Sequence, residues 1–261
     1  MARPIKTCAF CDAKAVTKGG EHLWDDWINQ EINPKTRFNA TKSWSKDLPP
    51  VKFSKRGLKE KIPTVCTPCN GGWMSALTAR MKERFQAAIL DGAPFSLDIK
   101  GAHLLTAFTL MKAIVKDCSH RDEPFFTRDA REQLRKTLAI PPLVKVWFSM
   151  YEGAARLNFR SNLYAVTPDT PGPLYGLEFF CYTYVVKNLT LQLLAPRWRD
   201  IRHRDRPLIT LSPDSYWQPA ATQFWPFNGS NLSWPPEKIL SDRVIEQFIN
   251  RFQVPISLSL G

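Results

Sequence analysis

Four of the six cysteines form two pairs with the spacing of metal-binding thiolates. The pairs are Cys8 with Cys11 and Cys66 with Cys69. Two such pairs can place four thiolates in a tetrahedron around a zinc ion. The 54 residues between Cys11 and Cys66 predict an inserted segment, because a compact zinc ribbon has roughly 15 to 20 there. The alternative is four unrelated thiols; a thioredoxin-like redox pair is disfavoured, because neither pair opens a helix in a strand-helix-strand pattern.

Three polar residues stand close to these pairs in the sequence. Glu21 and His22 follow the first pair, and Asn70 comes directly after Cys69, where a helix is expected to begin. A carboxylate and an amide oxygen could bind one divalent cation while the imidazole activates a water molecule. Asn70 could also serve as a helix cap, a role compatible with metal binding. These residues are therefore candidates for a catalytic site.

The sequence around the four cysteines and the three polar residues resembles that of the HNH endonucleases. Their ββα-metal finger combines a C-x-x-C pair, an Asp-His or Glu-His pair, and a second C-x-x-C followed at once by His or Asn. The matching runs here are Cys8-Ala9-Phe10-Cys11, Glu21-His22 and Cys66-Thr67-Pro68-Cys69-Asn70-Gly71-Gly72-Trp73-Met74-Ser75. The last run is similar to a bacterial branch of the family in which C-x-x-C-N-x-G-W-M-S is typical.

The resemblance implies a role for each matching residue. His22 would be the general base, and Glu21 and Asn70 would bind a catalytic Mg²⁺ or similar cation. The four cysteines would hold a separate, structural zinc. The implied activity is metal-dependent hydrolysis of phosphodiester bonds in DNA. Two alternatives remain open: a nuclease directed at RNA, and a non-catalytic zinc-finger module that binds nucleic acid.

The sequence departs from the family pattern at three places. The middle Asn or His, which orients the base, has no match in residues 59–65, and Asn39 is a candidate substitute. The segment between the cysteine pairs is long. Leu77-Thr78 stands where the bacterial branch would have Leu-Glu.

The charge of the chain favours a polyanionic partner. The net charge is +12, and residues 1–90 hold sixteen Lys and Arg against eight Asp and Glu, whereas the remaining residues hold twenty against sixteen. Neutralising phosphates releases counterions, so a basic surface suits nucleic acid; a basic protein without such a partner is the alternative. One predicted nucleic-acid-binding cluster comprises Lys52, Lys55, Arg56, Lys59 and Lys61, and a weaker candidate is the run of cations around Trp198, from Arg197 to Arg206.

The elements that must position these residues predict an α+β protein of two domains. The first, residues 1–92, would be the zinc-stapled HNH-like finger. It would have a turn or two of helix in 21–31, strands or a long loop in 35–61, and a helix over 73–90. The second, residues 93–261, has no assigned role beyond recognition or oligomerisation. Periodicity there predicts helices over 102–116, 127–138 and 236–252, and an antiparallel sheet with strands at 144–151, 155–167, 177–186 and 189–195.

The sequence also indicates where the protein works. No apolar run approaches the roughly eighteen residues that a bilayer crossing needs, and charged residues follow the N-terminus without an apolar signal segment. Six cysteines are too few for a disulfide scaffold, and the two C-x-x-C pairs suit a reducing compartment. We therefore expect a cytoplasmic protein without a membrane partner. A homodimer is one candidate assembly, because cutting both DNA strands commonly requires two active sites.

Overall fold

The computed structural model forms two compact units, Met1–Thr78 and Ala79–Gly261, each considered by itself below. It describes residues 7–14, 20–22, 25–31, 37–42, 51–56, 61–120, 123–154, 157–165, 176–198, 209–211, 216–253 and 258–260. In the strands Arg37–Lys42 and Val51–Arg56 the description is limited to the backbone.

The first unit contains a minimal strand-strand-helix arrangement. Strand β1 (Glu21–His22) pairs antiparallel with β4 (Lys61–Ile62), and β4 leads into the short helix α2 (Thr67–Cys69) and a π-helical turn (Asn70–Met74). Helix α1 (Asp26–Glu31) follows β1. The prediction of helix over residues 21–31 is therefore wrong for Glu21 and His22, because pairing with a distant strand holds them extended.

The segment between the cysteine pairs contains a β-hairpin. Strands β2 (Arg37–Lys42) and β3 (Val51–Arg56) pair antiparallel over all six residues of each. Of the two possibilities that the sequence left open for residues 35–61, strands are correct for these stretches.

Helix α3 (Ser75–Asp91) confirms the helix predicted over residues 73–90. Leu77, Met81, Phe85 and Ile89, which are four positions apart, are buried, and so is Ala88. The division between the units falls inside this helix, before the boundary predicted at residues 92 and 93. The later turns belong to the second unit because Phe85 packs edge-on against Phe95, with ring centroids 5.1 Å apart.

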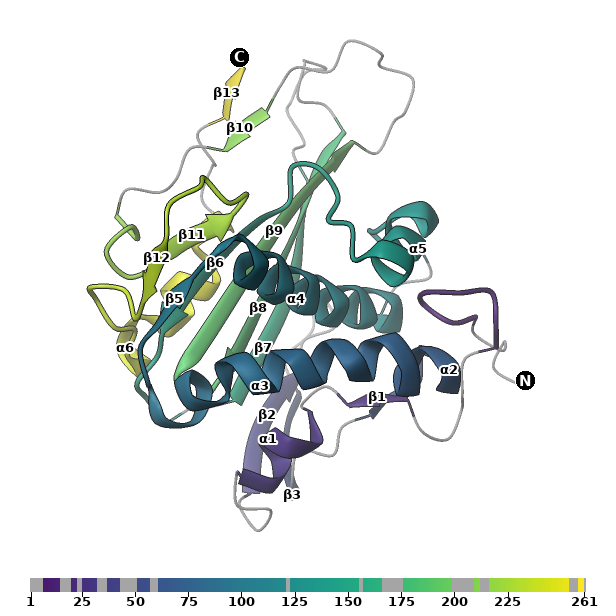
Figure 1. Cartoon of the computed structure of the whole chain (residues 1–261), viewed down its shortest axis with the longest axis horizontal. Coiled ribbons are helices and arrows are strands. Elements are labelled where there is room, and N and C mark those ends of the chain that lie inside the picture. Colours follow the sequence, from purple (N-terminus) through teal and green to yellow (C-terminus); the bar gives the residue numbers. More distant parts are fainter. Residues whose placement is uncertain are drawn as a thin grey trace. The chain divides into compact units, whose positions relative to one another are not determined.

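A five-stranded antiparallel sheet forms the centre of the second unit (Figure 1). Its strands, in the order β11-β6-β9-β8-β7, confirm the predicted antiparallel sheet and the α+β class. Their bounds are β6 Lys145–Met150, β7 Leu157–Ala165, β8 Leu177–Val186, β9 Leu189–Trp198 and β11 Thr222–Trp225. The four predicted strands match β6 to β9 to within a few residues.

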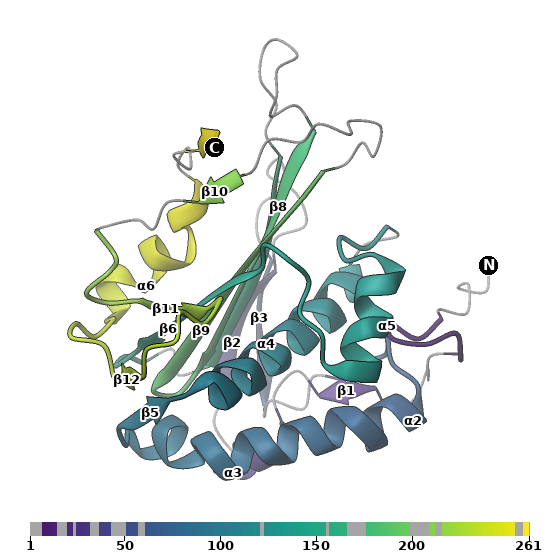
Figure 2. The same ribbon diagram turned by 45° about the horizontal axis from the view of Figure 1, so that its top comes forward.

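Helices cover both faces of this sheet, on opposite sides in Figure 2. Along β8, Tyr184 meets Phe108 of α4 (Ile99–His120), with ring centroids 6.1 Å apart. Phe179 lies on the other face, in a hydrophobic cluster with Phe248 of α6 (Asp242–Ile249). Successive strand residues alternate between faces, so covering both faces explains why all ten residues of β8 are buried.

The predicted C-terminal helix over residues 236–252 is shorter than expected. Before α6, the backbone of Leu240 bonds to Met150 and Glu152 at 2.8 Å each, which holds this stretch extended beside β6. The helix therefore starts only at Asp242, and a 3-10 turn (Arg251–Gln253) follows it.

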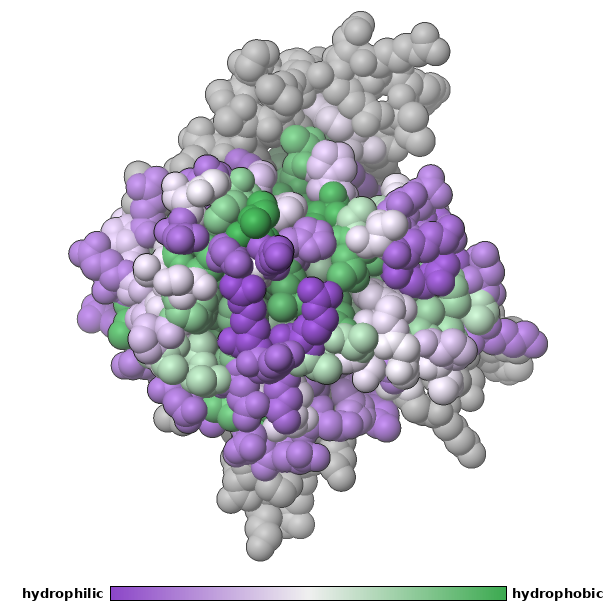
Figure 3. Space-filling view, viewed as in Figure 1, coloured by the Kyte–Doolittle hydropathy of each residue, from purple (hydrophilic) through white to green (hydrophobic). Residues whose placement is uncertain are grey.

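The remaining elements of the second unit lie around the sheet. Helix α5 (Arg128–Thr137) matches its predicted range, and Thr127 caps it by accepting a bond from the backbone N–H of Ala130. Hydrophilic surface gathers over this helix in Figure 3. Two short antiparallel pairs complete the unit: β5 (Phe95–Leu97) with β12 (Leu232–Trp234), and β10 (Ile209–Leu211) with β13 (Leu258–Leu260).

Within the described ranges, each helix is too short or too polar to cross a bilayer.

Candidate metal centre and active site

The four predicted cysteines come together in the first unit. Their Sγ atoms all lie within 4.8 Å of one another, and Cys11 Sγ is 3.4 Å from Cys66 Sγ and 3.6 Å from Cys69 Sγ. Four sulfurs placed tetrahedrally at about 2.3 Å from a zinc ion are roughly 3.8 Å apart. The four cysteines are thus close enough together to hold one metal ion, as their spacing predicts.

Backbone hydrogen bonds shape the first cysteine loop and tie it to the second. The N–H of Cys8 donates to Ala13 O at 2.8 Å, which closes the loop, and the N–H of Phe10 lies 3.4 Å from Cys8 Sγ. The N–H of Ala9 donates to Thr64 O at 2.7 Å, just before the second pair. These bonds place the first cysteine loop next to the residues that precede the second pair.

The electrostatic environment of the thiols differs from one to the next. Burial raises the pKa of the Cys69 thiol, and the neighbouring sulfurs of Cys66 and Cys8 raise it further. Burial also opposes ionisation of Cys8, but hydrogen bonds from the backbone N–H groups of Phe10, Cys66 and Cys11 outweigh it and lower the pKa of that thiol. Four thiolates so close together would repel one another. A bound divalent cation compensates their negative charge, and thiols that coordinate such a cation lose their protons.

Strand β1 depends on a glycine at its entrance. Gly20 has a φ of +102°, and a Cβ atom there would lie 2.4 Å from Ile62 O on the paired strand. Both the backbone conformation and the close approach therefore require glycine. The result is the antiparallel register in which Glu21 faces Ile62 and His22 faces Lys61.

Asn70 links the helical segment to this strand. Its side-chain Nδ2 donates to Gly20 O at 3.2 Å, across 50 residues of sequence. The amide therefore joins the residue after the fourth cysteine to the residue before Glu21. The capping role considered for Asn70 is wrong, because the helical segment already begins at Thr67 and Asn70 lies inside it with φ −65° and ψ −51°. With Nδ2 in this bond, Oδ1 is the atom that Asn70 can offer to a cation.

His22 is in contact with Asp26, a residue that the sequence did not identify as functional. Its Nδ1 lies 2.5 Å from Asp26 Oδ1, and the exposed fractions of the two side chains are 18% and 69%. A carboxylate that holds Nδ1–H leaves Nε2 as the basic nitrogen. The spacing of four residues between His22 and Asp26 was the feature of the sequence that could have indicated this contact. Asn39, the candidate for this role, lies in β2 opposite Ser54.

Glu21 occupies a different environment from its neighbour. Glu21 is 6% exposed. Adjacent residues of a strand point to opposite faces, so Glu21 and His22 are expected to differ in their surroundings. The cysteines are the only set of three or more His, Cys, Asp or Glu residues close enough for one ion in the described part of the chain. A cation bound by Glu21 and Asn70 would thus take its remaining ligands from water or substrate, as Mg²⁺ commonly does.

The predicted basic cluster is divided among several elements. Lys52, Lys55 and Arg56 lie in β3, and Lys61 is an exposed residue of β4. Lys59 lies outside the described residues.

The second basic run begins with a residue that has a structural role. Arg197 pairs with Glu178 at 2.7 Å and donates to the backbone oxygens of Phe125 and Pro124 at 2.6 and 3.1 Å. The Arg197 guanidinium is thus engaged in contacts within the second unit, and we no longer count it as part of the predicted nucleic-acid surface. Residues 199–208 of the same run lie outside the described residues.

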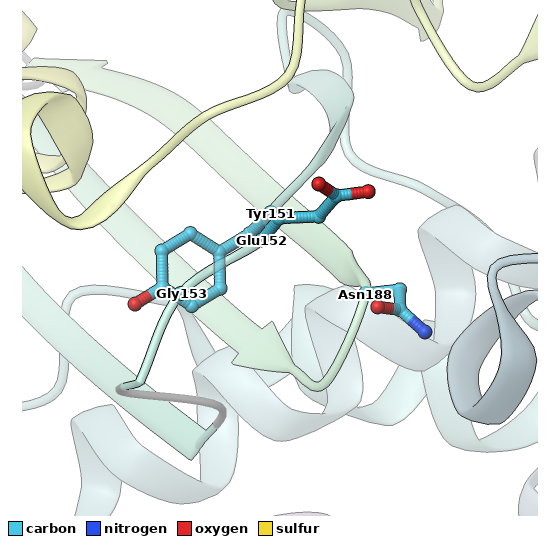
Figure 4. A pocket seen from close by; sticks show the side chains of 4 residues that line it. All are labelled: Tyr151, Glu152, Gly153 and Asn188. Carbon is cyan, nitrogen blue, oxygen red and sulfur yellow. The ribbon is translucent and has the colours of Figure 1, made fainter.

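A pocket of about 410 Å³ in the second unit is a weaker candidate site (Figure 4). It is lined by Tyr151, Glu152, Gly153 and Asn188. The tyrosine hydroxyl bonds to Asp242, and the Asn188 amide donates to the backbone oxygens of Ile89 and Leu90. These polar groups are engaged in holding the fold together, so the pocket offers little chemistry beyond the Glu152 carboxylate.

Comparison with known proteins adds no relative. No protein-family model matches the chain, and no curated protein or solved structure is significantly similar to it.

Proposed function

We propose that this chain is a metal-dependent endonuclease of the HNH type that hydrolyses phosphodiester bonds in DNA. The observation that carries the proposal is the bond from Asn70 Nδ2 to Gly20 O at 3.2 Å. It joins the residue after the second cysteine pair to the strand of Glu21 and His22, in a strand-strand-helix order. The residues that resemble the HNH family thus lie on a pair of antiparallel strands and on the helical segment that follows the second strand, and this placement supports the proposal.

In this proposal the cysteine centre holds zinc and acts as a scaffold. Cys8, Cys11, Cys66 and Cys69 offer four sulfurs and no open position, which is the donor set of a structural rather than a catalytic zinc site. The centre holds in place both segments that carry the proposed catalytic residues.

Hydrolysis would proceed through His22 as general base. Asp26 holds Nδ1, and Nε2 accepts a proton from a water molecule. The water oxygen then forms a bond to phosphorus as the bond from phosphorus to the leaving sugar oxygen breaks, and that oxygen takes a proton from solvent. Glu21 and Asn70 Oδ1 would hold a Mg²⁺ or similar cation, which supplies positive charge to the scissile phosphate and the leaving oxygen.

The second unit, on this proposal, contributes recognition or assembly rather than chemistry. A homodimer would supply two active sites for cutting both strands. A metal site built from thiols suits a cytoplasmic location, where thiols are kept reduced. The competing proposal is a zinc-finger module that binds nucleic acid without cutting it, and a nuclease for RNA is the third.

Incubation of the purified full chain with supercoiled plasmid separates these proposals. We expect nicking in the presence of Mg²⁺, Mn²⁺ or Ni²⁺, and none after the divalent cation is withheld, because the cation stabilises the charge that develops on the phosphate. Parallel reactions contain a single-stranded RNA. Binding without cleavage under all three metals would favour the non-catalytic module, and cleavage of the RNA alone would favour the ribonuclease.

A further inference from the structure

The hairpin between the cysteine pairs has two faces of different composition. In antiparallel strands, directly opposite residues share a face, and residues two apart along one strand share it too. The register pairs Arg37 with Arg56 and continues without a shift to Lys42 with Val51. One face therefore comprises Arg37, Asn39, Thr41, Lys52, Ser54 and Arg56, and the other comprises Phe38, Ala40, Lys42, Val51, Phe53 and Lys55.

The first of these faces, called the polar face below, has the composition of an anion-binding surface. Three of its six positions are cationic, none is acidic, and the other three are Asn, Thr and Ser. The opposite face holds four apolar residues. The polar face is therefore the one whose residue types suit a polyanionic partner.

We propose that the polar face binds the major groove of a DNA duplex. The major groove of B-DNA is about 12 Å wide and admits a two-stranded β-ribbon. Six residues at about 3.4 Å each span about 20 Å, the length of about six base pairs. In such a complex Arg and Lys contact the phosphates that flank the groove, while Asn, Ser and Thr can bond to base edges.

Double-stranded RNA fits this surface less well. Its major groove is deep and narrow, so side chains cannot read it, and its wide minor groove is recognised mainly through 2′-hydroxyls and phosphates. The choice of DNA rests on the proposed endonuclease function. The hairpin adds to that proposal the surface that would position the duplex.

The register also divides the basic cluster predicted from sequence. Lys52 and Arg56 belong to the polar face, whereas Lys55 lies opposite Phe38 on the other face. The two faces therefore provide matched pairs of cations on the same hairpin: Lys52 with Arg56, and Lys42 with Lys55.

Fluorescence anisotropy with a labelled DNA duplex tests this surface without requiring chemistry. The full chain is added in increasing amounts to the labelled duplex, without divalent cations and at several salt concentrations. We expect Lys52→Gln with Arg56→Gln to weaken binding by about tenfold or more, and the slope of log affinity against log salt to fall by about 2, since each lost phosphate contact removes about 1. The control pair, Lys42→Gln with Lys55→Gln, should weaken binding by less than about threefold through net charge alone.

Equal losses in the two pairs, or tighter binding to an RNA duplex of the same sequence, would overturn the assignment of this face to the DNA groove. Melting temperature and zinc content establish that each variant is folded; if a pair unfolds, the single variants Lys52→Gln and Lys55→Gln make the same comparison with half the slope change. Duplex binding that depends on the polar face without any cleavage would contradict the proposed nuclease but not this inference. Cleavage that is unchanged by substitutions on the polar face would contradict this inference but not the proposed nuclease.

Discussion

Cys69→Ser is expected to abolish metal binding at the cysteine centre and to unfold the first unit. Cys69 is 5% exposed and its sulfur lies 3.6 Å from Cys11 Sγ, so a hydroxyl there removes one of four converging donors from a buried position. Structural zinc contributes about 10 to 16 kcal/mol in zinc-finger peptides, which matches or exceeds the whole stability of a typical domain. The measurements are bound zinc by mass spectrometry and limited proteolysis of the first 78 residues.

Cys118→Ser is the matched control, because Cys118 lies in α4 outside the metal centre and accepts a bond from Arg131 at 3.5 Å. It should retain one zinc per chain and resist proteolysis like the unchanged protein. If Cys69→Ser also keeps a full equivalent of zinc and a protected N-terminal unit, the cysteines are not the scaffold described here.

His22→Ala is expected to lower the rate of DNA cleavage by about 10² to 10⁴-fold, the usual contribution of a general base. Because the side chain is a partly exposed member of a two-residue strand, its loss should leave folding and zinc content intact. His103→Ala is the control, since His103 lies in α4 of the second unit against Trp225 and should cleave at the normal rate. Single-turnover cleavage at saturating enzyme measures the chemical step; an unchanged rate in His22→Ala would remove His22 from the mechanism.

Asp26 provides a graded form of the same test. Asp26→Ala should slow cleavage by about 10 to 100-fold, as losses of orienting partners commonly do. Asp26→Asn should recover part of that loss, because an amide oxygen can still accept the bond from Nδ1. Nitrogen NMR of His22 provides a direct readout, since the proton should stay on Nδ1 in the unchanged protein and move to a mixture of nitrogens in Asp26→Ala. A rate loss with no change in the tautomer would assign Asp26 a purely structural role.

The parts of the fold that local patterns determine were predictable from sequence. The four cysteines converge because their spacing reflects ligand geometry, and α3 has its helical periodicity through Leu77, Met81, Phe85 and Ile89. Strand β8 was predicted with its observed bounds because a long run of aromatic and β-branched residues is enclosed by turn signals.

The parts that depend on long-range pairing were not predictable. Strand β1 contains two residues, and only its partner β4, some forty residues later, makes it a strand. The start of α6 was misplaced because the preceding residues pair with the end of β6. Asp26 was missed for a related reason: its contact with His22 joins the end of a strand to the first turn of α1, and that strand was not predicted.

In the proposed mechanism two metals bind the first unit at separate places, a zinc at the cysteines and a catalytic cation at Glu21 and Asn70. Anomalous diffraction from crystals grown with Mn²⁺, recorded at the zinc and manganese absorption edges, locates each metal directly. The account predicts a zinc peak among the four sulfurs and a manganese peak at the Glu21 carboxylate and Asn70 Oδ1. A manganese peak elsewhere, or none in crystals of protein that cleaves DNA with Mn²⁺ in solution, would contradict it.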